Sequence, residues 1–269
     1  MARGRATSTR TPWALGIPAL LGALLLVVPL AGLLVRAPWS GLGRLLATAE
    51  VADALRLSLL SATLATLVSL VLGVPLAWVL ARSELPGLRL LRALVTLPLV
   101  LPPVVGGVAL ILVLGRYGLV GQWLDQWFGI TLFGTTSAVV VAETFVAMPF
   151  LVVAVEGAFL SADRGYDEAA ATLGATRLTV FRRVTLPLVR PALVAGSVLC
   201  WARALGEFGA TITFAGNLQG STRTMPLAVY GAMETDTDAA LAPALVLLAV
   251  SVAVLFALRG RWVGGGGAP

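Results

Sequence analysis

Six long apolar runs, separated by short polar segments, constrain this chain more than any other feature of its sequence. A helix needs about 20 predominantly apolar residues to cross the hydrocarbon core of a bilayer, and each run is about that long. The runs cover residues 13–35, 55–81, 93–114, 136–160, 191–214 and 239–258. They predict an all-α integral membrane protein with six transmembrane helices in one domain, 13–258, between tails at 1–12 and 259–269.

The composition excludes an ordinary soluble domain. Hydrophobic residues make up 58% of the 269 residues and charged residues only 12%, and the mean hydropathy is +0.95. Soluble globular proteins carry roughly twice this charged fraction. The apolar surface of this chain therefore needs lipid as its solvent.

The arginines fall mainly on one side of the predicted membrane. Cytoplasmic loops and tails retain positive charge, so the richer side is predicted to be cytoplasmic and to hold both termini. One side carries Arg3, Arg5, Arg10, Arg82, Arg89, Arg92, Arg164, Arg177, Arg182, Arg183, Arg190, Arg259 and Arg261, and the other Arg36, Arg44, Arg116 and Arg223. The net charge of +6 thus reflects membrane topology, and we expect no nucleic-acid partner.

Several kinds of chemistry are disfavoured. Cys200 is the only cysteine and the chain has no histidine, which excludes a disulfide within the chain and a histidine-based zinc site. The commonest general base is missing too. We therefore predict no catalytic residue and no metal site, with an intramembrane enzyme or an energy-independent channel as the rival classes.

Helix-breaking residues concentrate in the third run. Pro98, Pro102, Pro103, Gly106 and Gly107 lie within ten residues, so the helix is predicted to be kinked or partly unwound. Backbone freed at membrane depth is tolerated where it is buried in protein or lines a cavity. This run is a candidate to line a pathway; the alternative is a kink that only shapes packing.

A polar segment, residues 161–187, separates the fourth and fifth runs. Asp163, Asp167 and Glu168 favour a helix start through the helix dipole, Gly174 is suited to the end of that helix, and Thr176 can cap a second one. The small side chains of Ala169, Ala170 and Ala171 would let another protein surface approach closely. The alternative is a solvated amphipathic connector.

The spacing of this segment resembles the EAA loop of bacterial ABC importer permeases. Glu168, Ala169 and Ala170 are followed by Gly174, and the pattern ends at Leu186 and Pro187. The resemblance implies a type I ABC importer permease fold in the cytoplasmic (inner) membrane and a loop that docks on a separate ATPase. The implied coupling residues are Asp167, Glu168, Ala169, Ala170, Gly174, Leu178, Phe181, Val184, Leu186 and Pro187.

Nucleotide chemistry is predicted to lie outside this chain. A phosphate-binding loop needs glycines followed by a lysine, and the chain contains no lysine. We expect no cofactor on this chain and Mg-ATP on the partner ATPase. The resemblance further implies an ATPase dimer, a second copy of the chain in a homodimer, and an extracytoplasmic binding protein.

Three segments point to a substrate. Residues 96–107, 201–217 and 222–230 resemble molybdate permeases, including ALGEFGA and FAGN within 204–217. Sulfate and thiosulfate permeases share the ALGEFGA core and are the alternative, with tungstate expected alongside molybdate because the two ions share shape and charge. The binding protein implied is therefore specific for molybdate.

Charged residues in the fifth run are candidates for the pathway. Arg203 and Glu207 are four residues apart and are expected to pair on one helix face, oriented toward the protein interior. We favour a structural ion pair; the alternative is that Arg203 attracts an oxyanion. The pathway and gate candidates are Pro102, Pro103, Gly106, Arg203, Glu207, Phe208, Gly209, Thr211 and Asn217.

Other polar and aromatic residues have simpler interpretations. Glu143 and Glu156 in the fourth run are expected to make buried polar contacts, since a carboxylate repels an anionic ligand. Trp123 and Trp127 are expected to anchor an outer segment at the membrane interface.

Overall fold

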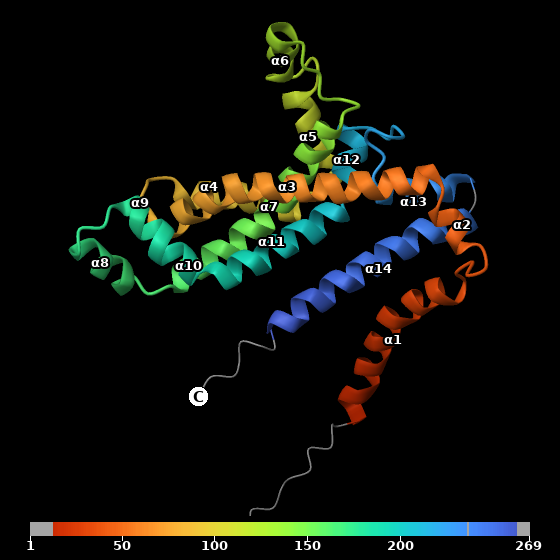
Figure 1. The fold of residues 1–269 in the computed structure, drawn as a ribbon, viewed down its shortest axis with the longest axis horizontal. Helices are drawn as coiled ribbons and strands as arrows, with labels where there is room; N and C mark the ends of the chain where they lie inside the picture. Colours follow the sequence, from red (N-terminus) through yellow and green to blue (C-terminus); the bar gives the residue numbers. More distant parts are fainter. Residues whose placement is uncertain (1–12, 236, 263–269) are drawn as a thin grey trace, which may run out of the picture.

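The computed structural model describes residues 13–235 and 237–262, and within them all regular structure is helical (Figure 1). The predicted all-α fold is confirmed. The tail 1–12 and residues 263–269 lie outside the described residues. The elements are α1 (Trp13–Val35), α2 (Leu42–Leu46), α3 (Ala49–Arg82), α4 (Leu88–Val100), α5 (Pro103–Leu114), α6 (Gly121–Phe128), α7 (Thr136–Ser161), α8 (Gly165–Thr172), α9 (Arg177–Val180), the π-helical turn η1 (Phe181–Thr185), α10 (Leu186–Leu188), α11 (Arg190–Leu205), α12 (Gly209–Phe214), α13 (Met225–Thr235) and α14 (Thr237–Trp262).

Four helices in the described part of the chain are each long and apolar enough to cross a bilayer: α1, α3, α7 and α14. They match the first, second, fourth and sixth apolar runs. Helix α3 has 34 residues, which at 1.5 Å per residue is about 51 Å. It therefore extends well beyond a hydrocarbon core of about 30 Å.

The third run is divided into α4 and α5, as its prolines predict. Pro98 is accommodated inside α4, whereas the backbone becomes extended at Leu101 and Pro102. Pro103 then occupies the first turn of α5, where its missing N–H costs nothing. The two prolines thus end one helix and begin the next.

The fifth run is also divided, which the sequence did not predict. Helix α11 ends at Leu205 and α12 begins at Gly209, so the expected single span over 191–214 is wrong in its middle. At its other end, α11 meets the helices of residues 177–188 at a bend of 74°. Counting that bent pair as one span, the described residues contain five candidate spans by length and composition.

The core lies where α3, α7 and α11 pack along one another (Figure 1). Alanine is its commonest buried residue, including Ala62 and Ala65 of α3, Ala147 of α7 and Ala204 of α11. Small side chains let helices approach closely in lipid, where packing replaces the hydrophobic effect between spans.

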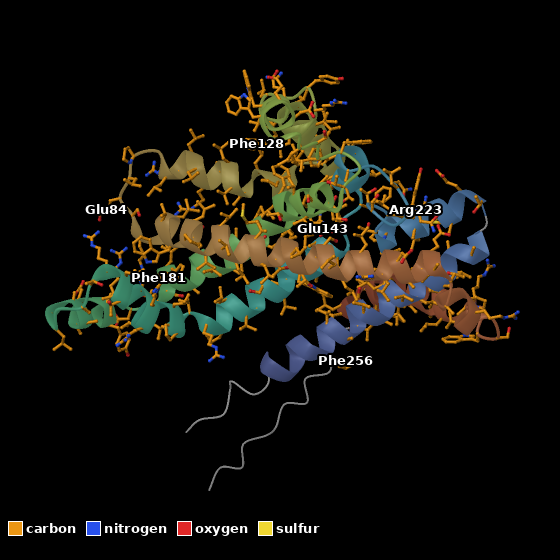
Figure 2. All side chains as sticks on the ribbon, turned by 45° about the horizontal axis from the view of Figure 1, so that its top comes forward. Glu84, Phe128, Glu143, Phe181, Arg223 and Phe256 are labelled. Atoms are coloured by element: carbon orange, nitrogen blue, oxygen red, sulfur yellow. The ribbon has the colours of Figure 1, made fainter. Side chains whose placement is uncertain are left out.

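Short helices lie at both ends of this bundle. Helices α8 to α10 lie at one end with the last turn of α3, and α2 and α13 lie at the opposite end (Figure 1). Figure 2 shows Glu84 and Phe181 at the first end, Arg223 at the other, and Glu143 between them. Helices α5 and α6 project from the side of the bundle (Figure 1).

Candidate functional site

The segment between α7 and α11 forms two helical stretches joined by a glycine turn, as predicted: α8 is the first, and α9, η1 and α10 follow one another without a gap as the second. Gly174 has φ +83°, a left-handed conformation that L side chains adopt only with strain. The N–H of Gly174 donates to the carbonyl of Ala171 (3.0 Å), and the N–H of Ala175 donates to that of Ala170 (3.1 Å). Thr176 caps α9, with its Oγ1 accepting from the N–H of Thr179 at 3.3 Å.

The outer side of this segment exposes apolar side chains beside charged ones such as Arg177 and Arg182. Leu173 is 89% exposed, Leu178 is 58% exposed, and Tyr166 is also exposed. Glu168 and Ala169 lie on the same exposed helix, α8. Sequence reasoning singled out Leu178 but missed Leu173 and Tyr166, although an apolar residue directly before the glycine turn was a usable signal. The segment therefore presents a surface that a partner protein could bury.

The inner side packs against the bundle. The ring of Phe181 lies 6.1 Å from Trp78 of α3 and 6.4 Å from Phe159 of α7, centroid to centroid. Val180 is buried beside it, and Val184 and Leu186 are half-buried, while Pro187 is exposed. Phe181, Val184 and Leu186 thus belong to the part of the loop that faces the membrane helices, and Leu178 to the part that faces away.

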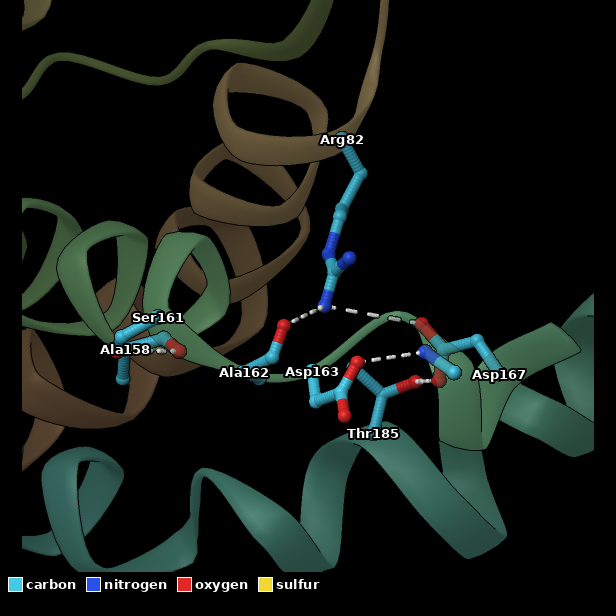
Figure 3. Close-up of polar contacts among 8 residues, drawn as sticks. Arg82, Ala158, Ser161, Ala162, Asp163, Asp167 and Thr185 are labelled. Carbon is cyan, nitrogen blue, oxygen red and sulfur yellow. Dashed lines mark hydrogen bonds and ion pairs between the residues drawn. The ribbon is translucent and has the colours of Figure 1, made fainter.

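Asp167 also points inward (Figure 3). Its Oδ1 accepts a hydrogen bond from Thr185 Oγ1 at 2.9 Å, and its Oδ2 lies 3.7 Å from Arg82 Nη2. The same Arg82 nitrogen donates to the carbonyl oxygen of Ala162 at 3.2 Å. Sequence reasoning missed Arg82 and Thr185, because nothing local to either residue indicates a partner on another element. A cavity of about 300 Å³ adjoins this cluster, lined also by Trp78 and Phe181.

The predicted pair of Arg203 and Glu207 exists, but it spans a helix end. Arg203 Nη1 lies 2.7 Å from Glu207 Oε2, and Glu207 Oε1 accepts from the N–H of Ala210 at 2.7 Å. Because α11 ends at Leu205, Glu207 lies in the break and not one turn along the same helix. Glu207 is 1% exposed and both its oxygens are used. This geometry fits the structural interpretation of the pair.

The breaks in the third and fifth runs lie side by side. A Cβ on Gly209 would stand 2.9 Å from Pro103 Cβ, and a Cβ on Gly107 would stand 2.6 Å from Thr213 Cβ. Helices α5 and α12 therefore touch through their backbones at both positions. The structure thus brings together Pro103 and Gly209, two of the predicted pathway residues.

Pro102, Gly106, Phe208 and Thr211 also lie on or beside α5 and α12 but have different surroundings. Thr211 is buried, and Gly106 faces the ring of Phe145. Pro102 is exposed. Phe208 packs on Tyr230, with ring centroids 5.2 Å apart.

Asn217 lies away from the breaks, in a polar cluster at the end of the bundle opposite the loop. Its Oδ1 accepts from Arg223 Nε at 2.9 Å, and Arg223 also pairs with Glu50 at the start of α3. The cluster borders a cavity of about 490 Å³. Asn217 is therefore separate from the pair of Arg203 and Glu207.

Two carboxylates of α7 make the buried contacts expected of them. Glu143 Oε1 accepts from Ser61 Oγ at 2.8 Å, and Glu156 Oε1 accepts from Arg92 Nε at 2.7 Å. The first bond joins α7 to α3 in the middle of the bundle (Figure 2), and the second joins α7 to α4.

The projecting helix α6 carries the aromatic pair. Trp123 and Trp127 are exposed, and their rings are 5.3 Å apart. Arg116 Nε donates to Asp125 Oδ2 at 3.1 Å; this hydrogen bond, with the charge of the carboxylate, raises the pKa of the Arg116 guanidinium above its ordinary value. The interfacial role of the two tryptophans stays a prediction.

Comparison with known proteins places this geometry in a family. Residues 73–261 match the model of the binding-protein-dependent transport system inner membrane component. The chain is 48% identical to the molybdenum transport system permease protein ModB of Mycobacterium tuberculosis, over 91% of this chain and 92% of that protein. It is 39% identical to the sulfate transport system permease protein CysT of Salmonella typhimurium, over 91% of this chain and 90% of that protein.

The fold also matches solved structures. One chain of a bacterial alginate ABC transporter, crystallised in complex with an alginate pentasaccharide-bound periplasmic protein, superposes with a TM-score of 0.77. The alignment covers 95% of this chain and 96% of that chain at 19% identity. At that identity the likeness establishes the fold of an ABC importer permease and nothing finer.

Proposed function

The chain belongs to the family of binding-protein-dependent transport system inner membrane components, and from this premise we propose that it is the permease subunit of an ATP-driven molybdate importer. It is a multi-pass protein of the inner membrane. We infer that molybdate passes from an extracytoplasmic binding protein, through the permease, to the cytoplasm. The energy comes from ATP hydrolysed on a separate subunit.

The observation that carries this proposal is the structured loop between α7 and α11. The chain has no lysine and no phosphate-binding motif, yet it holds two short helices at one end of the bundle with apolar side chains facing outward. A solvated connector has no reason to expose Leu173 and Leu178 together. An ATPase subunit that covers them gives the loop a function and places Mg-ATP on the partner.

The loop also suggests how the subunits communicate. When ATP closes the two ATPase subunits, each docked loop moves with its subunit, and the attached helices change between inward-facing and outward-facing states. The exposed residues Glu168, Ala169 and Leu178 would contact the ATPase subunit and move with it. The inward contacts of Phe181 and Asp167 would pass it to the bundle.

A second copy of the chain is proposed to complete the pathway. Within the described residues, α1 is almost entirely exposed and Val100, beside the break in the third run, is 86% exposed. Lipid can cover part of this surface. A homodimer would enclose the paired breaks between two copies and give them a pathway to line.

Molybdate is proposed as the substrate because the chain is more similar in sequence to the molybdenum permease than to the sulfate permease. Identity is 48% to the molybdenum permease and 39% to the sulfate permease at the same coverage of this chain. Molybdate and sulfate are both tetrahedral dianions, so the permease needs only a passage for such an ion. Because Glu207 neutralises Arg203, selectivity is proposed to come mainly from the binding protein. Sulfate is therefore the second candidate.

Reconstitution tests the proposal. The permease would be incorporated in proteoliposomes with a candidate ATPase and a candidate molybdate-binding protein from the same organism, and assayed for uptake of molybdate and sulfate with and without ATP. ATP-dependent uptake that favours molybdate is expected. Preferential sulfate uptake would overturn the assignment of molybdate as the substrate, and uptake without ATP or ATPase would identify a channel instead.

A further inference from the structure

Asp167 and Glu168 are neighbouring carboxylates on α8 with different surroundings. Glu168 is exposed on the outer side of the loop, while Asp167 is turned toward the bundle and meets Arg82 and Thr185 (Figure 3). On the proposed function, only Glu168 is placed to meet an ATPase. We propose that Arg82, Asp167 and Thr185 form a tether that positions α8 and carries its movement into α3.

The tether joins three elements through one carboxylate. Thr185 in η1 holds one oxygen of Asp167, and Arg82 at the end of α3 faces the other. Arg82 also holds the carbonyl of Ala162, the residue after α7. Helix α8 therefore cannot move away from the bundle without breaking contacts with α3, with η1, or with both.

The burial of the pair makes it more than a surface ion pair. The side chain of Arg82 is 9% exposed and that of Asp167 is 28% exposed. Pairs in such surroundings are screened little by water and salt, and removing one partner strands the other charge. The contact between Phe181 and Trp78, one turn earlier on α3, joins the second half of the loop to the same helix.

Helix α3 then connects the loop to the rest of the molecule. In its first half, Ser61 donates to Glu143 of α7 at 2.8 Å, and Ser58, one turn earlier, accepts from the N–H of Met225 at 2.7 Å. In its first turn, Glu50 pairs with Arg223. A movement delivered to Arg82 thus reaches α7 and the opposite end of the bundle through one continuous helix.

The test measures coupling in the reconstituted complex as the number of ATP molecules hydrolysed for each molybdate imported. For Asp167→Asn, we expect normal co-purification of the ATPase and a ratio raised by about 2- to 30-fold, the range for residues that modulate coupling. Asp167→Glu, which keeps the charge, should restore most of the coupling. Asp163→Asn is the matched control, since within the described residues that exposed carboxylate accepts only from the N–H of Gly165, and its ratio should be that of the wild type.

A double-variant cycle identifies the partner. Arg82→Gln combined with Asp167→Asn should raise the ratio no further than the worse single variant, because both remove one contact. If Arg82→Gln fails to fold, Thr185→Val tests the other bond without stranding a charge. It should raise the ratio, and Thr185→Ser should return it toward the wild-type value.

The outcomes separate this proposal from the one on which it rests. If wild-type permease binds no ATPase, the proposed function fails. If the wild type couples normally and Asp167→Asn keeps its ratio, the tether alone fails. Loss of ATPase binding in Asp167→Asn would make Asp167 a docking residue and also overturn the tether, as would independent, additive effects of Arg82→Gln and Asp167→Asn.

Discussion

The contact between α5 and α12 predicts that a single methyl group at Gly107 destabilises the protein. A Cβ there would lie 2.6 Å from Thr213 Cβ and 3.1 Å from the carbonyl oxygen of Ala210, whereas ordinary van der Waals contact begins at 3.4 Å. Both obstacles are fixed to the backbone of α12. Relief therefore requires the two helices to separate.

The expected magnitude follows from two opposing terms. Overpacking of a tight contact costs about 1–3 kcal/mol, and the rigid obstacles place Gly107→Ala near the upper value. Because alanine has a higher helix propensity than glycine, the substitution also stabilises the helix interior by about 1 kcal/mol. The free energy of unfolding should therefore fall by about 2 kcal/mol, which is roughly a 30-fold change in the ratio of folded to unfolded protein.

Thermal unfolding of the purified permease in detergent checks this prediction. Gly157→Ala in α7 is the control, because no heavy atom lies within 4 Å of its added Cβ. That variant should unfold at the wild-type temperature or slightly above it. Thr213→Gly, which removes the facing Cβ, should partly rescue Gly107→Ala. The reasoning is refuted if Gly107→Ala behaves like Gly157→Ala.

Three further predictions concern the loop and the break in the fifth run. Gly174→Ala forces an alanine to φ +83°, which costs about 1–2 kcal/mol, and should weaken ATPase co-purification. Glu168→Ala should abolish that co-purification and lower the unfolding temperature only slightly, because its carboxylate stabilises the first turn of α8 through the helix dipole but makes no hydrogen bond or ion pair within the described part of the chain. Unchanged co-purification would contradict the docking assignment. Glu207→Ala leaves Arg203 and the N–H of Ala210 without their acceptor and should destabilise the protein by about 3–5 kcal/mol, measured by unfolding, with a smaller loss for Glu207→Gln.

The sequence predicts those parts of the fold whose causes are local. Apolar runs of sufficient length gave α1, α3, α7 and α14, and the prolines at 102 and 103 gave the division of the third run. Gly174 and Thr176 mark the turn and the cap of the loop through their own backbone and side-chain preferences. Each of these signals lies within a few residues of the structure it specifies.

The features that the sequence did not predict depend on contacts between residues far apart in the chain. Asp167 was predicted as a coupling residue by its place in the motif, but its orientation is set by Arg82, which is 85 positions earlier, and by Thr185. Phe181 shares the apolar spacing of Leu178, yet Trp78 and Phe159 draw it inward. A one-dimensional pattern shows that a helix has an apolar face, not which neighbour covers it.

The composition of the fifth run does not reveal the position of its break. Residues 204–210 are glycine or apolar residues except Glu207, and they would be compatible with a continuous helix. A break at membrane depth is tolerated only if freed backbone groups find partners, and Glu207 supplies one by accepting from the N–H of Ala210 while it neutralises Arg203. The neighbouring break needs less compensation because Pro102 and Pro103 have no N–H to satisfy. Gly209 then lets the two interruptions pack directly against each other, so the one carboxylate in this apolar stretch stabilises an irregular backbone that its neighbours alone would not produce.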